Sequence, residues 1–212
     1  MKYRNAPAGA ELGLLALLAL SACAPALVSS WTSPDATNFK VRGEKIAAVV
    51  IAADDAIRLA AEDALARELA KHGAQGIPMY TLAPGAARGD EAKARAAAEE
   101  AGVVGVVVMR PVLADKEISS SIYSESIYGT FWGGYYGYGW ASPWGPGMVP
   151  GGEIRTDTIV FVETLVFGLR ENKLLWAGQS KTSNPRNLDR LIEDTAAQVL
   201  QELERLGLIT ES

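Results

Sequence analysis

The sequence is nearly devoid of the residues from which metal centres and disulfides are built. Its 212 residues include one cysteine and one histidine. A single cysteine cannot form a disulfide within the chain, and a zinc site needs several Cys or His ligands. We therefore expect no metal site, no intramolecular disulfide and no cofactor.

Positive charge is also scarce. Lysine and arginine together number 20 against 25 aspartate and glutamate residues, which leaves a net charge of -5. Proteins that bind the phosphate backbone of nucleic acids carry basic surfaces. We expect no nucleic acid partner.

The residues that typically form catalytic sites do not occur together. The sequence has no Gly-x-Ser-x-Gly motif, and His72 falls where a helix is expected to end, which favours a capping role. Asp54 and Asp55 are adjacent in the sequence, which favours a helix N-cap over a pair of catalytic carboxylates. We predict that the protein is not an enzyme.

Long apolar runs are missing, but a short one lies near the start of the chain. Lys2 and Arg4 precede an apolar run over residues 12–20, and small residues follow. This layout is typical of a secretory signal, and the run is shorter than the roughly 20 residues that a membrane-spanning helix needs.

The only cysteine of the chain directly follows this segment. Leu20, Ser21, Ala22 and Cys23 resemble the lipobox of bacterial lipoproteins. The resemblance implies a signal peptide over residues 1–22, a mature chain that begins at Cys23, and a diacylglyceryl lipid on Cys23 that anchors it to the membrane. The alternative is an incidental thiol beside an ordinary cleavage site. Ala24 after the cysteine, in place of Asp, implies the outer membrane, with the protein facing the periplasm.

Residues 23–40 carry Pro25, several serines and no apolar period, which is typical of a tether. Trp31 lies within it, where it either folds back on the domain or contacts a membrane or partner. The domain itself is expected over residues 41–210.

Apolar patterns in this domain predict alternating strands and helices. Strands are expected over residues 46–53, 77–82, 103–109, 154–169 and 174–182, and helices over residues 55–71, 90–101 and 188–206. Pro111 is expected to interrupt the third strand, and Pro78 suggests that the second lies at an edge of the sheet. The order βαβαβ-ββ-α predicts an α/β fold, in which three helices cover a mixed sheet of about five strands.

An insertion over residues 118–152 departs from this pattern. Glu125 is its only charged residue, and its second half is rich in glycine and aromatic residues. Three interpretations remain open: a flexible loop that partly covers the sheet edge, a surface that binds a protein or glycan, or a segment that enters a membrane interface. The candidate partner-binding residues are Phe131, Trp132, Tyr135, Tyr136, Tyr138, Trp140 and Trp144.

Several loose motifs together resemble a widespread family of small bacterial lipoproteins built on a domain of unknown function. They are Arg58-xxx-Glu62-Asp63-x-Leu65-xxx-Leu69-xxx-Gly73, Gly102-Val103-Val104, the Gly/Tyr/Trp loop, Glu163-Thr164-Leu165-Val166 and Asn172-Lys173-Leu174-Leu175-Trp176-Ala177-Gly178. The resemblance implies a periplasmic α/β domain without known catalytic residues. The chain departs from the family at Gly168-Leu169-Arg170, where an acidic pair is expected.

Together these features predict a lipoprotein of the bacterial envelope with a non-catalytic binding or scaffolding role, toward an envelope protein or a glycan. The alternative is a subunit of an oligomeric outer-membrane secretion or pore assembly, because residues 118–128 and 154–164 flank the aromatic loop and are able to extend as a hairpin. Against the alternative, Ser119, Ser120 and Ser121 break the alternation that a membrane strand needs.

Overall fold

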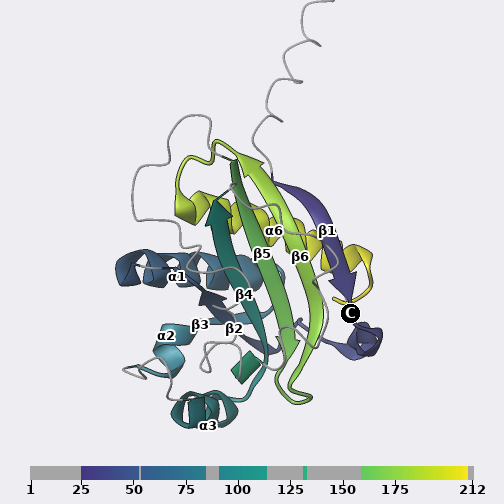
Figure 1. The fold of residues 1–212 in the computed structure, drawn as a ribbon. Coiled ribbons are helices and arrows are strands. Elements are labelled where there is room, and N and C mark those ends of the chain that lie inside the picture. Colours follow the sequence, from purple (N-terminus) through teal and green to yellow (C-terminus); the bar gives the residue numbers. More distant parts are fainter. Residues whose placement is uncertain (1–24, 53, 85–90, 114–130, 133–158, 210–212) are drawn as a thin grey trace, which may run out of the picture.

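A mixed sheet of six strands forms the centre of the computed structural model, which describes residues 25–52, 54–84, 91–113, 131–132 and 159–209. The strand order is β1-β6-β5-β4-β2-β3 (Figure 1). Strands β2, β3 and β4 are parallel to one another, whereas β1, β5 and β6 add antiparallel pairs. The strands are β1 (Ala26–Thr32), β2 (Lys45–Val50), β3 (Gln75–Pro78), β4 (Val103–Leu113), β5 (Ile159–Gly168) and β6 (Lys173–Ser183).

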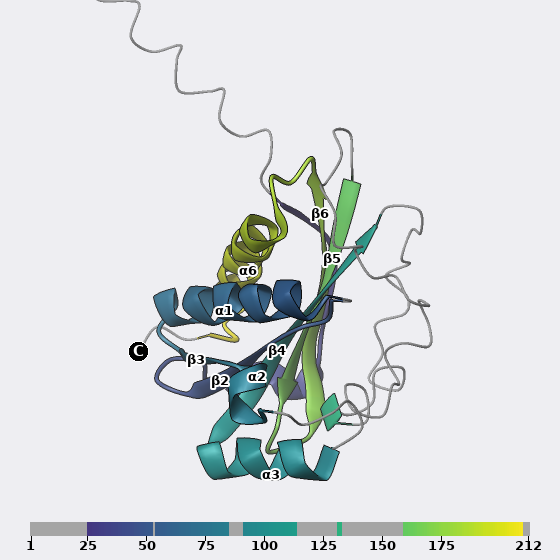
Figure 2. The same cartoon turned by 90° about the vertical axis from the view of Figure 1, so that its left-hand side faces the viewer.

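Helices cover both faces of the sheet (Figure 2). They are α1 (Asp55–Lys71), α2 (Met79–Leu82), α3 (Glu91–Ala101) and α6 (Leu188–Arg205), with a 3-10 helix η1 (Pro34–Asn38) after β1. Helices α1 and α6 lie side by side on one face, and α2 and α3 lie on the other. The predicted α/β class, the mixed sheet and its three long helices are thus confirmed, with one strand more than expected.

The larger core lies between the sheet and the α1–α6 layer. Leu65 and Leu69 of α1 and Val199 and Leu203 of α6 are all buried there, at the three- and four-residue spacings read from the sequence. The predicted helix ends are also confirmed: Asp54 caps α1 by accepting a hydrogen bond from the backbone N–H of Ile57. Burial of these apolar faces fixes both helices on the sheet.

The N-terminal segment differs from its prediction. Residues 23–40 read as a tether, but Ala26–Thr32 form strand β1, which pairs antiparallel with β6 at the edge of the sheet. The serines in this segment gave it little apolar pattern, so the sequence did not predict a strand. An edge strand needs fewer apolar residues than a central one. Trp31 is half-buried and packs on the core beside the sheet, which agrees with the interpretation that it folds back. The sheet therefore begins before residue 41.

The predicted strand over residues 77–82 is only partly present. Strand β3 ends at Pro78, and the chain turns at once into α2. The hydroxyl of Thr81 donates to the carbonyl of Pro78, and the backbone N–H of Tyr80 donates to Glu62, so local polar contacts favour the turn over a longer strand. The expected edge position of this strand is confirmed.

Strand β4 continues through Pro111, where an interruption was expected. The carbonyl of Met109 accepts a hydrogen bond from Ile51, so the backbone of Met109 faces β2. Two residues on, the nitrogen of Pro111 points to the same side, but β2 has ended there. Because no ladder hydrogen bond is lost, β4 pairs with β5 as far as Leu113.

Candidate functional site

The proposed lipid attachment residue lies just outside the described residues. Cys23 precedes the first residue of β1, Ala26, by three positions. Three residues of extended chain span at most about 11 Å. Any group attached to Cys23 is therefore joined to the edge of the sheet almost directly.

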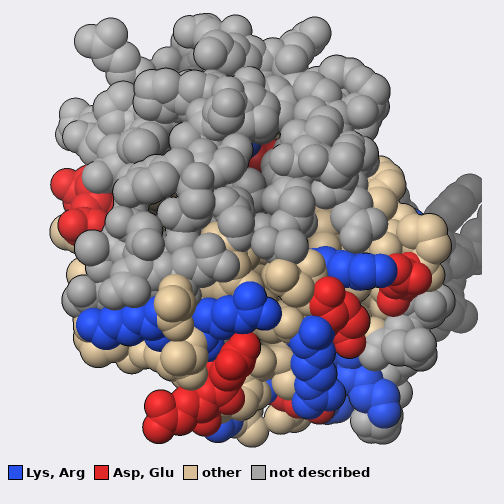
Figure 3. Space-filling model, turned by 60° about the horizontal axis from the view of Figure 1, so that its bottom comes forward, with Lys and Arg blue, Asp and Glu red and all other residues tan. Residues whose placement is uncertain are grey.

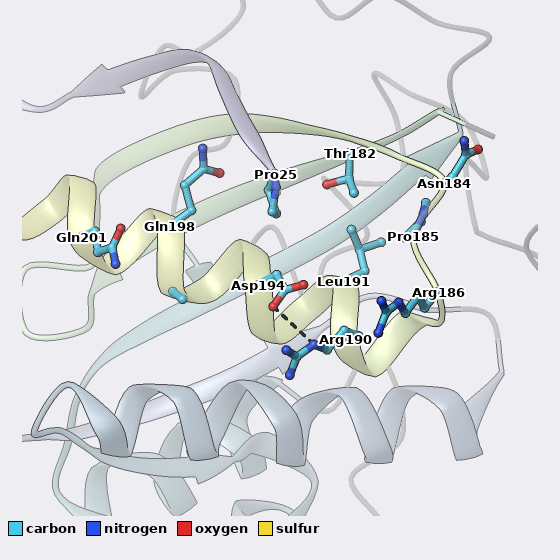
Figure 4. A pocket seen from close by; sticks show the side chains of 11 residues that line it. Pro25, Thr182, Asn184, Pro185, Arg186, Arg190, Leu191, Asp194, Gln198 and Gln201 are labelled. Atoms are coloured by element: carbon cyan, nitrogen blue, oxygen red, sulfur yellow. Dashed lines mark ion pairs between the residues drawn. The ribbon is translucent and has the colours of Figure 1, made fainter. Parts of the chain in front are cut away.

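A pocket of about 460 Å³ opens beside this same end of β1 (Figure 4). Its walls come from Pro25, the end of β6, the connection after β6 and the exposed face of α6. The hydroxyl of Ser180 donates to the side-chain oxygen of Gln198 at 2.9 Å, which ties β6 to α6 under the pocket. Volumes of this size are typical of small-ligand sites.

Some polar side chains that line the pocket have partners within the described residues, and others do not. Arg190 pairs with Asp194 on the same helix, at 3.5 Å between Nε and Oδ1. Arg186 is exposed, and no ion pair within the described part of the chain engages it. Thr182 is 4% exposed, and its hydroxyl has no hydrogen-bond partner among the described residues. These residues carry no common signal in the sequence, because they become neighbours only when β6 and α6 pack together.

The structure describes two of the seven candidate aromatic residues. Phe131 and Trp132 are 0% and 2% exposed, and they pack with Phe167 in the core on the α3 side of the sheet. These two rings are thus part of the core, and a partner cannot reach them in this structure. The reason is that the central strands present a second apolar face, which α2 and α3 cover together with these rings. Tyr135, Tyr136, Tyr138, Trp140 and Trp144 lie outside the described residues.

A buried ion pair lies on the same side of the sheet. Arg110 of β4 and Glu163 of β5 are directly opposite in register, with 2.5 Å between Nη2 and Oε2. Their side chains are 9% and 2% exposed. Opposite charges within two otherwise apolar strands were visible in the sequence, but only the strand register shows that they meet.

A buried polar cluster forms around Glu62 of α1. Glu62 of α1 is fully buried, and its carboxylate accepts hydrogen bonds from the backbone N–H groups of Val50 and Tyr80 and from Arg58. The hydroxyl of Tyr80 donates to Asp63 at 2.9 Å. Burial away from water raises the pKa of Glu62 above its ordinary value, against the lowering effect of these donors. The cluster joins the end of β2 to α2, which gives it a structural role.

The only histidine joins two helices. His72 follows the last residue of α1, and its Nδ1 lies 3.0 Å from Oε1 of Glu204 on α6. Its Nε2 lies 3.7 Å from Glu68. The predicted position at a helix end is confirmed, and the ring contacts carboxylates of both helices.

Within the described ranges, no group of three or more His, Cys, Asp and Glu side chains is arranged to hold a metal ion. None of the helices seen in these ranges is both long and apolar enough to cross a membrane.

Figure 3 shows acidic and basic side chains mixed on the face that carries α3, and Arg95 and Glu99 of that helix form an ion pair at 3.1 Å.

Comparisons with known proteins identify no family for this chain. No model of a protein family matches the sequence, and no curated protein is significantly similar to it. Among solved structures, the chain is similar to PelC from Paraburkholderia phytofirmans, described as a dodecamer, with 12% sequence identity and a TM-score of 0.45 over 84% of this chain and 96% of that one. A variant of the same PelC gives 13% identity and a TM-score of 0.43 over 85% and 97% of the two chains.

Proposed function

We propose that the protein is a lipoprotein of the bacterial outer membrane, held by a lipid on Cys23 and facing the periplasm, where its domain acts as a non-catalytic binding or scaffolding module. The observation that carries this proposal is the short distance along the chain between the lipobox cysteine and β1. A lipid at Cys23 would hold the edge of the sheet close to the bilayer, because three residues leave no room for a flexible spacer.

Two or three acyl chains are enough for stable attachment, since each buried CH₂ contributes ~0.8 kcal/mol. No further apolar element is then needed to hold the domain at the membrane. The domain itself is free to bind an envelope protein or a glycan through the surfaces that the anchor leaves exposed.

Replacement of the anchor residue tests the proposal. In cells grown with a labelled fatty acid, we expect the natural chain to carry the label and to fractionate with membranes. The Cys23→Ser variant is expected to carry no label. A matched control, Cys23→Ser with Ser30→Cys, restores a thiol at an exposed position of β1 and is also expected to stay unlabelled. Label in either variant, or none in the natural chain, contradicts the proposal.

The second candidate is a subunit of an oligomeric envelope assembly, and the free edge of β1 favours it. Among the described residues, β1 ends the sheet on one side, and Val28 in its middle is 48% exposed. An open edge of this kind is able to pair with a strand of another chain. Size measurement in neutral detergent distinguishes the two candidates: a ring favours the assembly, whereas a monomer favours the binding module.

A further inference from the structure

The pocket between Pro25, Thr182 and α6 has the features of a binding site and lies next to the proposed anchor (Figure 4). We propose that it binds the phosphate headgroup of an anionic glycerophospholipid from the leaflet that holds the lipid of Cys23. This inference rests on the proposed function for its choice of ligand source. The pocket and its polar groups are independent of that function.

The first observation is an unsatisfied hydroxyl. Thr182 is more than nine-tenths buried and lines the pocket, and its Oγ1 makes no hydrogen bond within the part of the chain that the structure describes. In Figure 4 this oxygen points across the pocket toward Pro25. A buried polar group without a partner costs about 1–3 kcal/mol, so a native structure rarely keeps one without a use. A ligand oxygen in the pocket would provide the missing partner.

The second observation is the charge at one end of the pocket. The side chains of Arg186 and Arg190 lie at the same end of α6 (Figure 4). Arg190 forms ion pairs with Asp194 and Glu193. Arg186, by contrast, is exposed and has no ion pair among the described residues. Two arginines against one aspartate in the lining give this end a positive balance in a protein of net charge -5. Arginine binds phosphate oxygens in pairs, which suits a phosphodiester.

The remaining lining favours a headgroup over a bare ion. The side chains of Gln198 and Gln201 lie along the pocket away from the arginines, and that of Asn184 lies near Arg186. All three carry the donors and acceptors that glycerol hydroxyls need. Phosphate alone would fill only a part of about 460 Å³. Because Pro25 is two residues from Cys23, the pocket opens within about 10 Å of the bilayer that the anchor would enter.

Titration of the full chain in a neutral detergent tests the proposal. The probes are dihexanoyl phosphatidylglycerol, dihexanoyl phosphatidylcholine and sodium phosphate, and the measurement is the chemical shift of the backbone amides around Thr182, Asn184 and Arg190. We expect saturable shifts with phosphatidylglycerol. The cationic choline group would lie beside Arg186, so at least a fivefold weaker response is expected with phosphatidylcholine. Phosphate alone is expected to shift the same amides only at tenfold or higher concentration.

Two variants and a control assign the binding to this pocket. Arg186→Gln and Thr182→Val are each expected to weaken phosphatidylglycerol binding at least fivefold. Thr182→Val removes a buried hydroxyl that has no hydrogen-bond partner among the described residues, so the thermal stability of the variant should equal or exceed that of the parent. Arg170→Gln changes an exposed arginine at the β5–β6 turn, at the opposite end of the sheet, and is expected to leave binding unchanged.

The outcomes separate this inference from the proposed function. Equal binding of the two lipids, shifts away from the pocket, or unchanged binding in both variants overturns it. If phosphate binds as tightly as phosphatidylglycerol, the claim that the ligand is a lipid headgroup is contradicted. The same titration on the Cys23→Ser chain is expected to give the same result, because the micelle replaces the anchor. Binding there, together with absent lipid labelling in the natural chain, would contradict the lipoprotein assignment alone.

Discussion

Arg110 and Glu163 face each other across β4 and β5 and form an ion pair that is almost completely buried. Charges are costly to bury, and such pairs stabilise a protein only when the partner and its hydrogen bonds are in place. The pair lies on the α3 side of the sheet, at the end of β4 that extends beyond its pairing with β2.

Removal of one member of this pair should therefore destabilise the fold strongly. We expect Arg110→Met to lower the free energy of unfolding by about 3–5 kcal/mol, because it leaves the Glu163 carboxylate buried without its cation. The double variant Arg110→Met with Glu163→Leu should regain most of this loss. Urea unfolding curves of the parent, single and double variants measure the difference, and equal losses in the single and double variants would contradict this account.

The buried carboxylate of Glu62 predicts a specific pH dependence. Because its pKa is raised in the folded state, mainly by burial, the folded chain binds its proton more tightly than the unfolded chain does. This contribution to stability is therefore present below the ordinary carboxyl pKa and falls as the pH rises through the raised value. The variant Glu62→Gln lacks it.

Chemical unfolding of the parent and of Glu62→Gln across pH 4–8 checks this sign. We expect the parent's free energy of unfolding, relative to that of the variant, to decrease as the pH rises. An increase would mean that the hydrogen bonds from Arg58 and from the N–H groups of Val50 and Tyr80 lower the pKa of Glu62 by more than burial raises it.

The position of Trp132 in the core predicts which part of the insertion the domain needs. We expect Trp132→Ala to lower the free energy of unfolding by about 3–5 kcal/mol, as for other buried tryptophans. Trp31→Ala, on the edge strand and only half-buried, is the matched control and should cost less. Equal losses would place Trp132 outside the core.

Replacement of residues 133–152 by a short Gly/Ser linker should leave thermal unfolding within a few degrees of the parent, provided that Phe131 and Trp132 are kept. Both rings are kept because they are buried in the core. A pull-down from envelope extracts with the same variant tests the remaining aromatic residues as a partner-binding surface. An unchanged set of partners would contradict that role.

The layer of helices over the larger core gives a further prediction. Leu65 is fully buried under α1, so Leu65→Ala should cost about 2–5 kcal/mol. Leu206, which is 37% exposed after α6, is a control whose change to Ala should stay within about 0.5 kcal/mol. A loss at Leu206 as large as that at Leu65 would contradict the helix assignment.

The helices and central strands were predictable from the sequence because their signals are local. The N-cap at Asp54, the stripe that contains Val199 and the valine run of β4 each depend on residues close in sequence. Strand β1 was not predictable in this way. Its alternation is weak, and only its pairing with β6 makes it a strand.

The candidate sites were less predictable than the fold. Cys23 is a candidate from the sequence because it ends a contiguous motif that resembles a lipobox. The pocket around Thr182 and Arg186 brings together β1, β6 and α6, which are far apart in sequence. The aromatic residues stood out by composition, but composition does not show which rings a second sheet face will bury. Phe131 and Trp132 illustrate this difference.

The most direct measurement of the central claim is the intact mass of the protein extracted from membranes of cells that produce it. The account predicts a chain of residues 23–212 with a diacylglyceryl group on Cys23, and one further acyl chain where the new amine is modified. A chain that retains residues 1–22, or one that begins at another residue without lipid, would contradict it.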